Sequence, residues 1–167
     1  MTMDANPLVG MVMGSESDWE TMRRGHAILR EFGVPHECKV MSAHRTPDLV
    51  EGYVATAEER GIEVLIAGAG LAAALPGVVA AMTTLPVLGV PLAAGALNGQ
   101  DALYSIVQMP PGIPVGTLGI GSIGARNAAL LAIAIIANRH PEYREKIKTY
   151  RAKQAGKIRA IELPLDE

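Results

Sequence analysis

Short apolar segments alternate with helical patterns along most of this 167-residue chain. Their length and β-branched content are typical of buried strands, expected at 8–13, 36–41, 64–67, 86–90 and 114–118. Between and after them, apolar residues at helical spacing predict helices at 19–32, 47–60, 76–84, 101–108 and 125–138. Strand–helix alternation of this kind favours a parallel sheet, and strands that are apolar throughout are expected where helices cover both faces. We therefore predict an α/β protein with a parallel five-stranded sheet.

The length fits a single domain, 1–167, with a core at about 8–138. After His140 and Pro141 the composition changes, and the segment at about 141–160 is rich in Lys and Arg but poor in large apolar residues. This pattern indicates a C-terminal helical tail that is exposed or contacts a partner. Because it has little to pack on its own core, we expect it to lie across a neighbouring subunit.

Composition excludes several classes of protein. Apolar residues make up 49% and charged residues 19% of the chain, so most of it is expected to fold. A formal net charge of −2 and only 4% aromatic residues argue against a nucleic-acid partner. The most apolar stretch, 128–137, is about half as long as a membrane span, and the first residues have no signal-peptide pattern. We expect a cytoplasmic protein with no membrane partner.

Four polar or reactive side chains are expected to be structural. Cys38 is the only cysteine, so it cannot form an intramolecular disulfide, and no Cys/His spacing predicts a zinc site. We expect it to be a buried soft hydrophobe. His26 falls within a predicted helix, His36 begins a strand, and His140 precedes a proline in a polar tail. Each of the three is expected to be structural or solvated.

Ligands of open parallel sheets bind at the carboxyl ends of the strands, so the segments that follow each strand are expected to contain the ligand-binding residues. After the first strand, Ser15 and Ser17 offer hydroxyl groups beside the free N–H groups of a helix N-terminus, which suits a phosphate. The alternative is that they only cap the helix, since Ser17 and Glu20 have capping-box spacing. Neither a Walker loop nor a G-x-G-x-x-G pattern is present, which disfavours a nucleoside triphosphate or a dinucleotide.

After the second strand, Thr46 and Pro47 are typical of a helix start, which places His44 and Arg45 on the preceding turn. A histidine there can transfer protons near neutral pH, and an arginine can bind a phosphate or carboxylate. A structural histidine and a surface arginine are the alternative. The segments after the third and fourth strands, 68–77 and 91–99, have almost no polar side chains. They predict an apolar wall that suits an uncharged species or a decarboxylation favoured by desolvation.

Several motifs occur together in order between Val9 and Ala137. They are Gly14-Ser15-Glu16-Ser17-Asp18-Trp19, Ser42-Ala43-His44-Arg45-Thr46-Pro47, Ala67-Gly68-Ala69-Gly70 and Ser105-Ile106-Val107-Gln108-Met109-Pro110. In these motifs the chain resembles the bacterial (class I) N5-carboxyaminoimidazole ribonucleotide mutase family, PurE. The resemblance implies a three-layer α/β/α, flavodoxin-like fold assembled as a homo-octamer with sites at subunit junctions. It also implies an isomerase of purine biosynthesis that moves a carboxylate from N5 to C4 of a nucleotide substrate, without a cofactor or metal.

The resemblance implies a role for each matching residue. His44 is the expected general acid/base of a decarboxylation followed by recarboxylation. Phosphate and ribose are expected to bind to polar residues of the first two loops, namely Ser15, Ser17, Asp18, Ser42 and Arg45, with Asp18 suited to the ribose hydroxyls. The remaining expected substrate contacts are Ala43, Ala69, Gly70 and Leu71.

Four residues depart from the family pattern, and all four are apolar. Leu71 stands where the family has glycine, Ala74 where it has histidine, and Ala93-Ala94 where it has Gln-Ser. Loss of a positioned acid or base typically lowers a rate by about 10²–10⁴-fold. One alternative is therefore a diverged paralogue, a decarboxylase or carboxylase of a related small heterocycle or nucleotide. A non-catalytic nucleotide-binding or assembly subunit is a third hypothesis.

Overall fold

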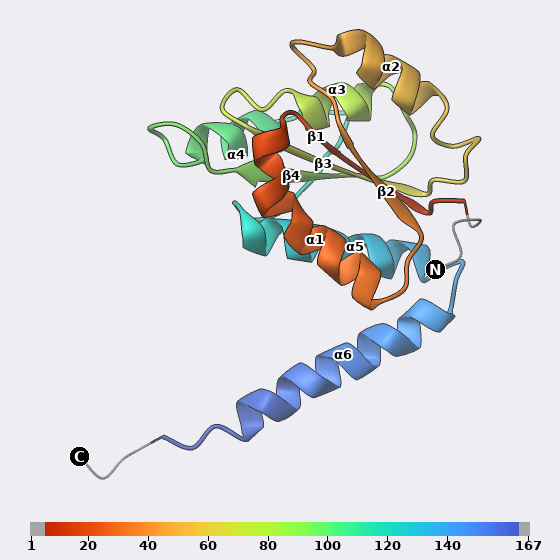
Figure 1. Cartoon of the computed structure of the whole chain (residues 1–167), viewed down its shortest axis with the longest axis vertical. Coiled ribbons are helices and arrows are strands. Elements are labelled where there is room, and N and C mark those ends of the chain that lie inside the picture. The colour runs from red at the N-terminus through yellow and green to blue at the C-terminus, as the bar shows by residue number, and fades with distance from the viewer. Residues whose placement is uncertain (1–5, 164–167) are drawn as a thin grey trace.

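Five parallel strands form the centre of the protein in the computed structural model, which describes residues 6–163 (Figure 1). They are β1 (Val9–Met13), β2 (His36–Val40), β3 (Val64–Gly70), β4 (Val87–Leu92) and β5 (Gly116–Thr117). Their order in the sheet is β2-β1-β3-β4-β5, with every neighbouring pair parallel. This is the order of flavodoxin-like sheets, so the predicted fold class is confirmed.

Helices cover both faces of the sheet (Figure 1). The first layer contains α1 (Trp19–Glu31) and α5 (Ser122–Ile136), and the second contains α2 (Pro47–Ala55), α3 (Leu75–Ala81) and α4 (Gln100–Val107). Successive residues of a strand point to opposite faces. Met11 and Met13 of β1 therefore pack into the α1/α5 layer, while Val12 packs into the other. All three side chains are buried, which explains why β1 is apolar at every position.

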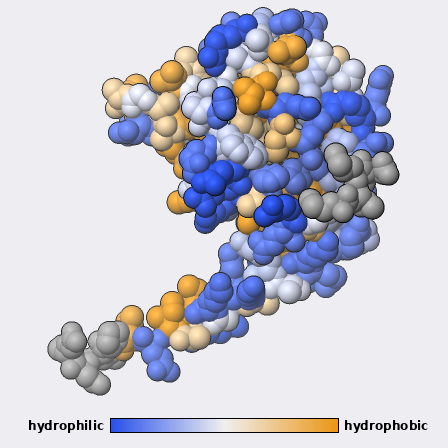
Figure 2. All heavy atoms as spheres, in the orientation of Figure 1, coloured by the Kyte–Doolittle hydropathy of each residue, from blue (hydrophilic) through white to orange (hydrophobic). Residues whose placement is uncertain are grey.

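The last helix, α6 (Glu142–Arg159), extends away from the three layers (Figure 1). Its first half is attached to the end of α1. The Tyr143 hydroxyl donates to the Gly33 carbonyl (3.4 Å), the Lys146 ammonium donates to the Phe32 carbonyl (2.6 Å), and the Tyr150 ring lies 5.4 Å from that of Phe32. The far half exposes apolar side chains, including Ile158, at the end of a largely polar rod (Figure 2). The predicted C-terminal helix is present.

The third strand is longer than the sequence pattern predicts. β3 ends at Gly70 rather than at Ala67, because Gly68 pairs with Val90 and Gly70 with Leu92 of β4. The first of these glycines packs closely against α1, since a Cβ atom on Gly68 would lie 2.5 Å from the Met22 sulfur and would displace that side chain. β4 correspondingly continues to Leu92. The segment expected to begin a loop therefore belongs to the sheet.

Three other boundaries also differ from expectation. α2 ends at Ala55 instead of 60, because the Thr56 hydroxyl bonds back to the Gly52 carbonyl (3.2 Å) and turns follow up to Gly61. β5 contains only Gly116 and Thr117 instead of 114–118. α5 begins at Ser122 instead of 125, three residues earlier. Among the described residues, none of the helices combines the length and the apolar character needed to cross a lipid bilayer.

Candidate functional site

The first wall of the candidate site is the connection between β1 and α1, which contains the short 3-10 helix η1 (Glu16–Asp18). Ser15 precedes this helix in extended conformation, and its Oγ accepts a hydrogen bond from the Ser17 backbone N–H (3.3 Å). The two serine hydroxyls lie 2.9 Å apart. They form one polar cluster at the start of a helical segment, where free N–H groups favour an anion.

The capping box suggested by the sequence does not form. Ser15, two residues before the expected Ser17, caps the 3-10 helix, and α1 begins after Asp18 without a side-chain cap. Glu20 forms a salt bridge with Arg23 on the exposed face of α1 instead of bonding back to the helix start. Because Ser17 does not cap α1, its hydroxyl is available to a ligand.

Asp18 stands at the inner side of this loop and is half-buried. Burial raises the pKa of its carboxyl above the usual value, although the backbone of Ser15 and Gly14 and the charge of Arg45 oppose this shift. The carboxylate is partly desolvated, and further hydrogen-bond donors would stabilise its charged form. Hydroxyl groups of a bound sugar are donors of that kind.

The second wall is the turn between β2 and α2. Pro47 occupies the first turn of α2, as predicted, and Thr46 precedes it. The Thr46 hydroxyl does not cap the helix but accepts from the Ser42 backbone N–H (2.9 Å), which closes the turn. The intervening residues, His44 and Arg45, are consequently held outward at the carboxyl edge, and both are exposed.

Arg45 joins the two loops. Its backbone N–H and its Nε both donate to the Ser42 hydroxyl, at 3.2 and 3.3 Å, and its Nη2 donates to the Gly14 carbonyl (2.6 Å). The guanidinium is therefore positioned between the end of β1 and the end of β2. A guanidinium fixed in this way places its remaining N–H donors for a phosphate or carboxylate.

The third wall comes from the segment after β3, where Ala74 immediately precedes α3. Leu71 adopts a left-handed conformation (φ 56°), which costs a residue with a side chain roughly 1–2 kcal/mol. Its side chain is 55% exposed and reaches toward the segment after β4, since a Cβ atom on Gly95 would lie 3.1 Å from Leu71 Cδ2. Leu71 thus connects the two apolar loops over the mouth of the site.

These walls enclose one cavity of about 510 Å³. Every residue predicted to bind substrate or transfer protons lines it, namely Ser15, Ser17, Asp18, Ser42, Ala43, His44, Arg45, Ala69, Gly70 and Leu71. Gly14, Ala72, Ala73 and Leu75 complete the lining, and the sequence pattern had not singled out the last three as contacts. Two further substituted positions, Ala74 and Ala94, also face the cavity, whereas Ala93 is not part of its lining. The cavity is polar on the β1/β2 side and apolar on the β3/β4 side.

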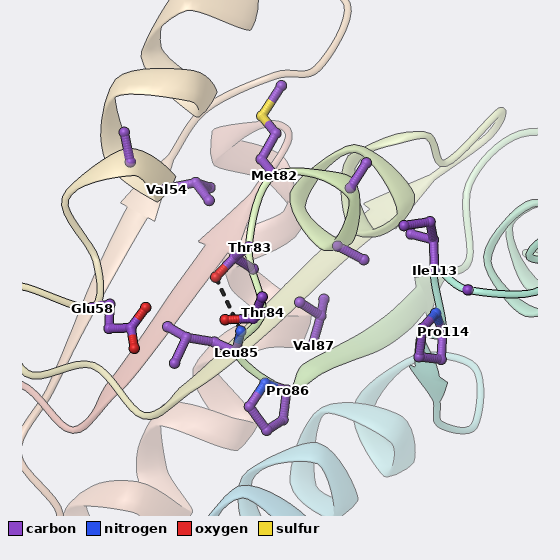
Figure 3. Close-up of a pocket in the computed structure, with 14 residues that line it drawn as sticks. Val54, Glu58, Met82, Thr83, Thr84, Leu85, Pro86, Val87, Ile113 and Pro114 are labelled. Carbon is purple, nitrogen blue, oxygen red and sulfur yellow. Dashed lines mark hydrogen bonds between the residues drawn. The ribbon is translucent and has the colours of Figure 1, made fainter.

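A larger cavity, of about 710 Å³, lies at the opposite, amino-terminal edge of the strands (Figure 3). It is lined by the end of α2, the end of α3 and the start of β4, and Glu58 is its only ionisable residue. Thr83 is engaged locally, because its hydroxyl accepts from the Leu85 backbone N–H (3.1 Å). With one carboxylate and no proton-transfer pair, this cavity lacks the groups that nucleotide chemistry requires.

The chain is similar to proteins of known family. The sequence profile of the family described as AIR carboxylase matches residues 8–157. The N5-carboxyaminoimidazole ribonucleotide mutase of Aquifex aeolicus is 61% identical over 141 residues, covering 84% of this chain and 83% of that protein. The corresponding mutase of Vibrio cholerae is 55% identical, covering 95% and 99%. A crystal structure of Treponema denticola PurE has a TM-score of 0.85 at 29% identity, covering 96% and 99%. The chain belongs to the AIR carboxylase family.

Proposed function

We propose that this protein is an N5-carboxyaminoimidazole ribonucleotide mutase, an isomerase of purine biosynthesis. The observation that carries the proposal is the convergence of the first three strand ends on one cavity with a polar and an apolar half. Two relatives named for this activity, which the chain matches over 83% and 99% of their length, support the proposal further. Strand ends alone would indicate only a ligand site, whereas this combination suits a nucleotide whose carboxylate reacts beside an apolar wall.

The polar half is proposed to bind the ribonucleotide. Ser15, Ser17 and the Arg45 guanidinium would hold the phosphate, since hydroxyls, helix N–H groups and a planar cation are its usual partners. Asp18 would accept hydrogen bonds from the ribose hydroxyls. Ser42 orients Arg45 through two hydrogen bonds, so its contribution is to position the guanidinium as well as to line the cavity.

The apolar half is proposed to contain the reacting carboxylate. In the first step the bond between N5 and the carboxylate carbon breaks, CO2 is released, and N5 gains a proton. In the second step C4 attacks the CO2 and loses its proton. His44 lines the same cavity and is the group proposed to supply the first proton and remove the second, so no net proton is consumed. Ala69, Gly70 and Leu71 would exclude water around the CO2.

The test is turnover of N5-carboxyaminoimidazole ribonucleotide, measured by the ultraviolet change on formation of the C4-carboxylated product. We expect turnover by the wild-type chain and a fall of about 10²–10⁴-fold in kcat for His44→Asn, with nucleotide binding retained in calorimetry. His140→Asn is the matched control, because His140 pairs with Glu63 (2.9 Å) outside the cavity. Unchanged turnover in His44→Asn would remove His44 from the mechanism, and an inactive wild-type protein that binds the nucleotide would contradict the mutase activity.

A diverged activity is the second candidate, because three of the four substituted positions, Leu71, Ala74 and Ala94, line the cavity. Decarboxylation or carboxylation of a related heterocycle would tolerate these apolar side chains. Restoring the histidine in Ala74→His separates the two candidates. If the wild-type chain is a mutase, Ala74→His should keep or raise its kcat on N5-carboxyaminoimidazole ribonucleotide. If the wild-type chain is a paralogue adapted to another substrate, it should be inactive on this nucleotide, and Ala74→His should create mutase activity.

We also infer that the chain belongs to the class I enzymes and works as a homo-oligomer, with an octamer as the specific expectation. The first part is supported by relatives that are named mutases rather than carboxylases. The second is supported by apolar side chains that this chain leaves exposed, such as Tyr104, Ile123 and Ile158, at 63%, 68% and 70% exposure. Large apolar side chains that one chain leaves exposed often mark the surfaces at which subunits meet.

A further inference from the structure

Three side chains with metal-binding atoms meet on the α1 side of the edge strand β2. His36 and Cys38 are two residues apart on this strand, so they share a face, and His26 approaches them from α1. One ligand atom from each lies within 4.8 Å of the others, and all three residues are partly buried. None of them lines the candidate active site. The cluster is therefore a separate feature of the molecule.

Hydrogen bonds orient the two imidazole rings toward a common point. His36 Nδ1 lies 2.7 Å from the Val34 carbonyl, which can only accept, so this nitrogen carries the proton and Nε2 presents a lone pair. That Nε2 is 2.8 Å from His26 Nδ1, and the Cys38 sulfur is 4.0 Å from the same His26 nitrogen. A histidine that donates one N–H to a backbone carbonyl and presents its other nitrogen is the usual arrangement in metal sites.

The spacing also matches the size of a tetrahedral metal site. Zinc–nitrogen bonds of about 2.0 Å and zinc–sulfur bonds of about 2.3 Å imply N–N separations of about 3.4 Å and N–S separations of about 3.6 Å. The observed 2.8 and 4.0 Å differ from these by roughly half an ångström, which rotation of side chains can supply. The thioether of Met11, 3.9 Å from the Cys38 sulfur, adds a second soft atom at the inner side. Thiolate, thioether and imidazole together favour soft d10 cations.

We propose that His26, His36 and Cys38 bind one thiophilic cation of the Zn²⁺ or Cu⁺ class. On binding, the His26 proton moves from Nδ1 to Nε2, the Cys38 thiol releases its proton to solvent, and the sulfur–metal bond forms without any oxidation. The bound ion would tie α1 to β2, which has a neighbouring strand on one side only.

The first test is metal binding to the untagged full-length chain after treatment with a chelator. We expect one Zn²⁺ per chain in calorimetry, and a Cu⁺ titration under anaerobic conditions distinguishes the two ions. Trp19 is the only tryptophan, and its ring lies 5.4 Å from that of His26, so its fluorescence should change at the same stoichiometry. Co²⁺ in place of zinc should give a thiolate-to-metal charge-transfer band.

Variants decide whether these three residues are the ligands. Cys38→Ser should abolish the cobalt charge-transfer band, and His36→Gln should weaken Zn²⁺ binding by more than about tenfold. Zn²⁺ should raise the Tm of the wild-type chain but not that of either variant, since only a folded site binds. His140→Gln, which changes a histidine outside the cluster, should behave as wild type.

Two results would overturn the proposal. One is the absence of a thiolate band and of saturable binding in the wild-type chain with either ion. The other is one-equivalent binding that persists unchanged in Cys38→Ser and His36→Gln, both checked for folding by circular dichroism. Either result would leave the His26–His36 contact as a hydrogen bond that only joins α1 to the sheet.

Discussion

Two residues of the candidate site adopt a conformation or an environment that is unfavourable for the stability of the fold. Leu71 occupies a left-handed backbone conformation that suits glycine, and Asp18 is a half-buried carboxylate at the inner end of a loop. Both residues line the cavity. Strain and desolvation that the rest of the fold supports are frequent at functional sites, because a ligand supplies the missing partner.

Leu71→Gly is expected to remove the backbone strain with little loss of packing, because the leucine side chain is 55% exposed. The Tm should stay equal or rise slightly, and the KM for the nucleotide should fall as the mouth of the cavity opens. Leu71→Ala removes the bulk but keeps the strain, so it should share the KM effect without the stability gain. A marked fall in Tm for Leu71→Gly, measured by thermal unfolding, would show that the contact with the Gly95 loop outweighs the strain.

Asp18→Asn is expected to change stability in a pH-dependent way. Because burial raises the pKa of the Asp18 carboxyl in the folded protein, its neutral form is favoured there. The associated stability is fully present below the unfolded value of 3.8 and is lost as the pH rises through the higher folded value. Asparagine stays neutral, so the variant should have a higher Tm than wild type at neutral pH and the same Tm in acid. A lower Tm at neutral pH would mean that Arg45 and the backbone outweigh the desolvation.

Elements of secondary structure fit together through a few close contacts that the sequence pattern does not reveal. α1 crosses α5 at Gly25, where a Cβ atom would lie 2.6 Å from the Ala125 carbonyl oxygen. Gly52, inside α2, has open space around the same position. These two glycines look alike in the sequence but differ in tertiary environment.

This pair provides a matched test of the α1/α5 packing. Gly25→Ala should lower the free energy of unfolding by about 1–3 kcal/mol, since the backbone of α5 must move. Gly52→Ala should raise it by about 0.5–1 kcal/mol, because alanine favours the helix and meets nothing. Urea unfolding of both variants measures the difference. Equal changes in the free energy of unfolding would indicate that the backbone of α5 moves away from position 25 without loss of stability.

The molecule as a whole consists of a three-layer body and a helix that leaves it. The first half of α6 contacts the body through side chains that include Tyr143, Lys146 and Tyr150. Ile158 and Ile161 in the far part are 70% and 60% exposed. Among residues 6–163 these exposed apolar side chains have no partner that covers them, so we expect a neighbouring subunit to do so.

Removal of residues 151–167, which keeps Tyr150, is therefore expected to reduce the assembled mass in light scattering while leaving the Tm of the three-layer body nearly unchanged. Ile158→Lys in the full-length chain should act in the same direction, because a charge at a buried contact is unfavourable. Lys157→Ala, a change at a neighbouring residue, is the control. A truncated chain that keeps the wild-type mass would show that α6 does not hold the subunits together.

The fold class could be predicted from the sequence alone, and so could the sheet edge at which we expect a ligand. Apolar runs separated by helical patterns leave a parallel sheet as the stable arrangement, and such sheets present their loops at one edge. Residues at or beyond the carboxyl ends of β1, β2 and β3, such as Ser15, His44 and Gly70, could thus be expected together, and one cavity contains them. The chemical role of each remains a prediction, since position at an edge specifies proximity but not reaction.

The contacts that these residues make depend on the folded arrangement of the chain. β3 continues to Gly70 because β4 pairs with it, Ser15 replaces Ser17 as the cap, and Arg45 spans from Ser42 to Gly14. His26, His36 and Cys38 were expected to be unrelated structural residues, yet α1 and β2 bring them together. Local patterns carry information about neighbours along the chain. Strand length, capping partner and side-chain clusters depend on neighbours in space, which the chain acquires only when it folds.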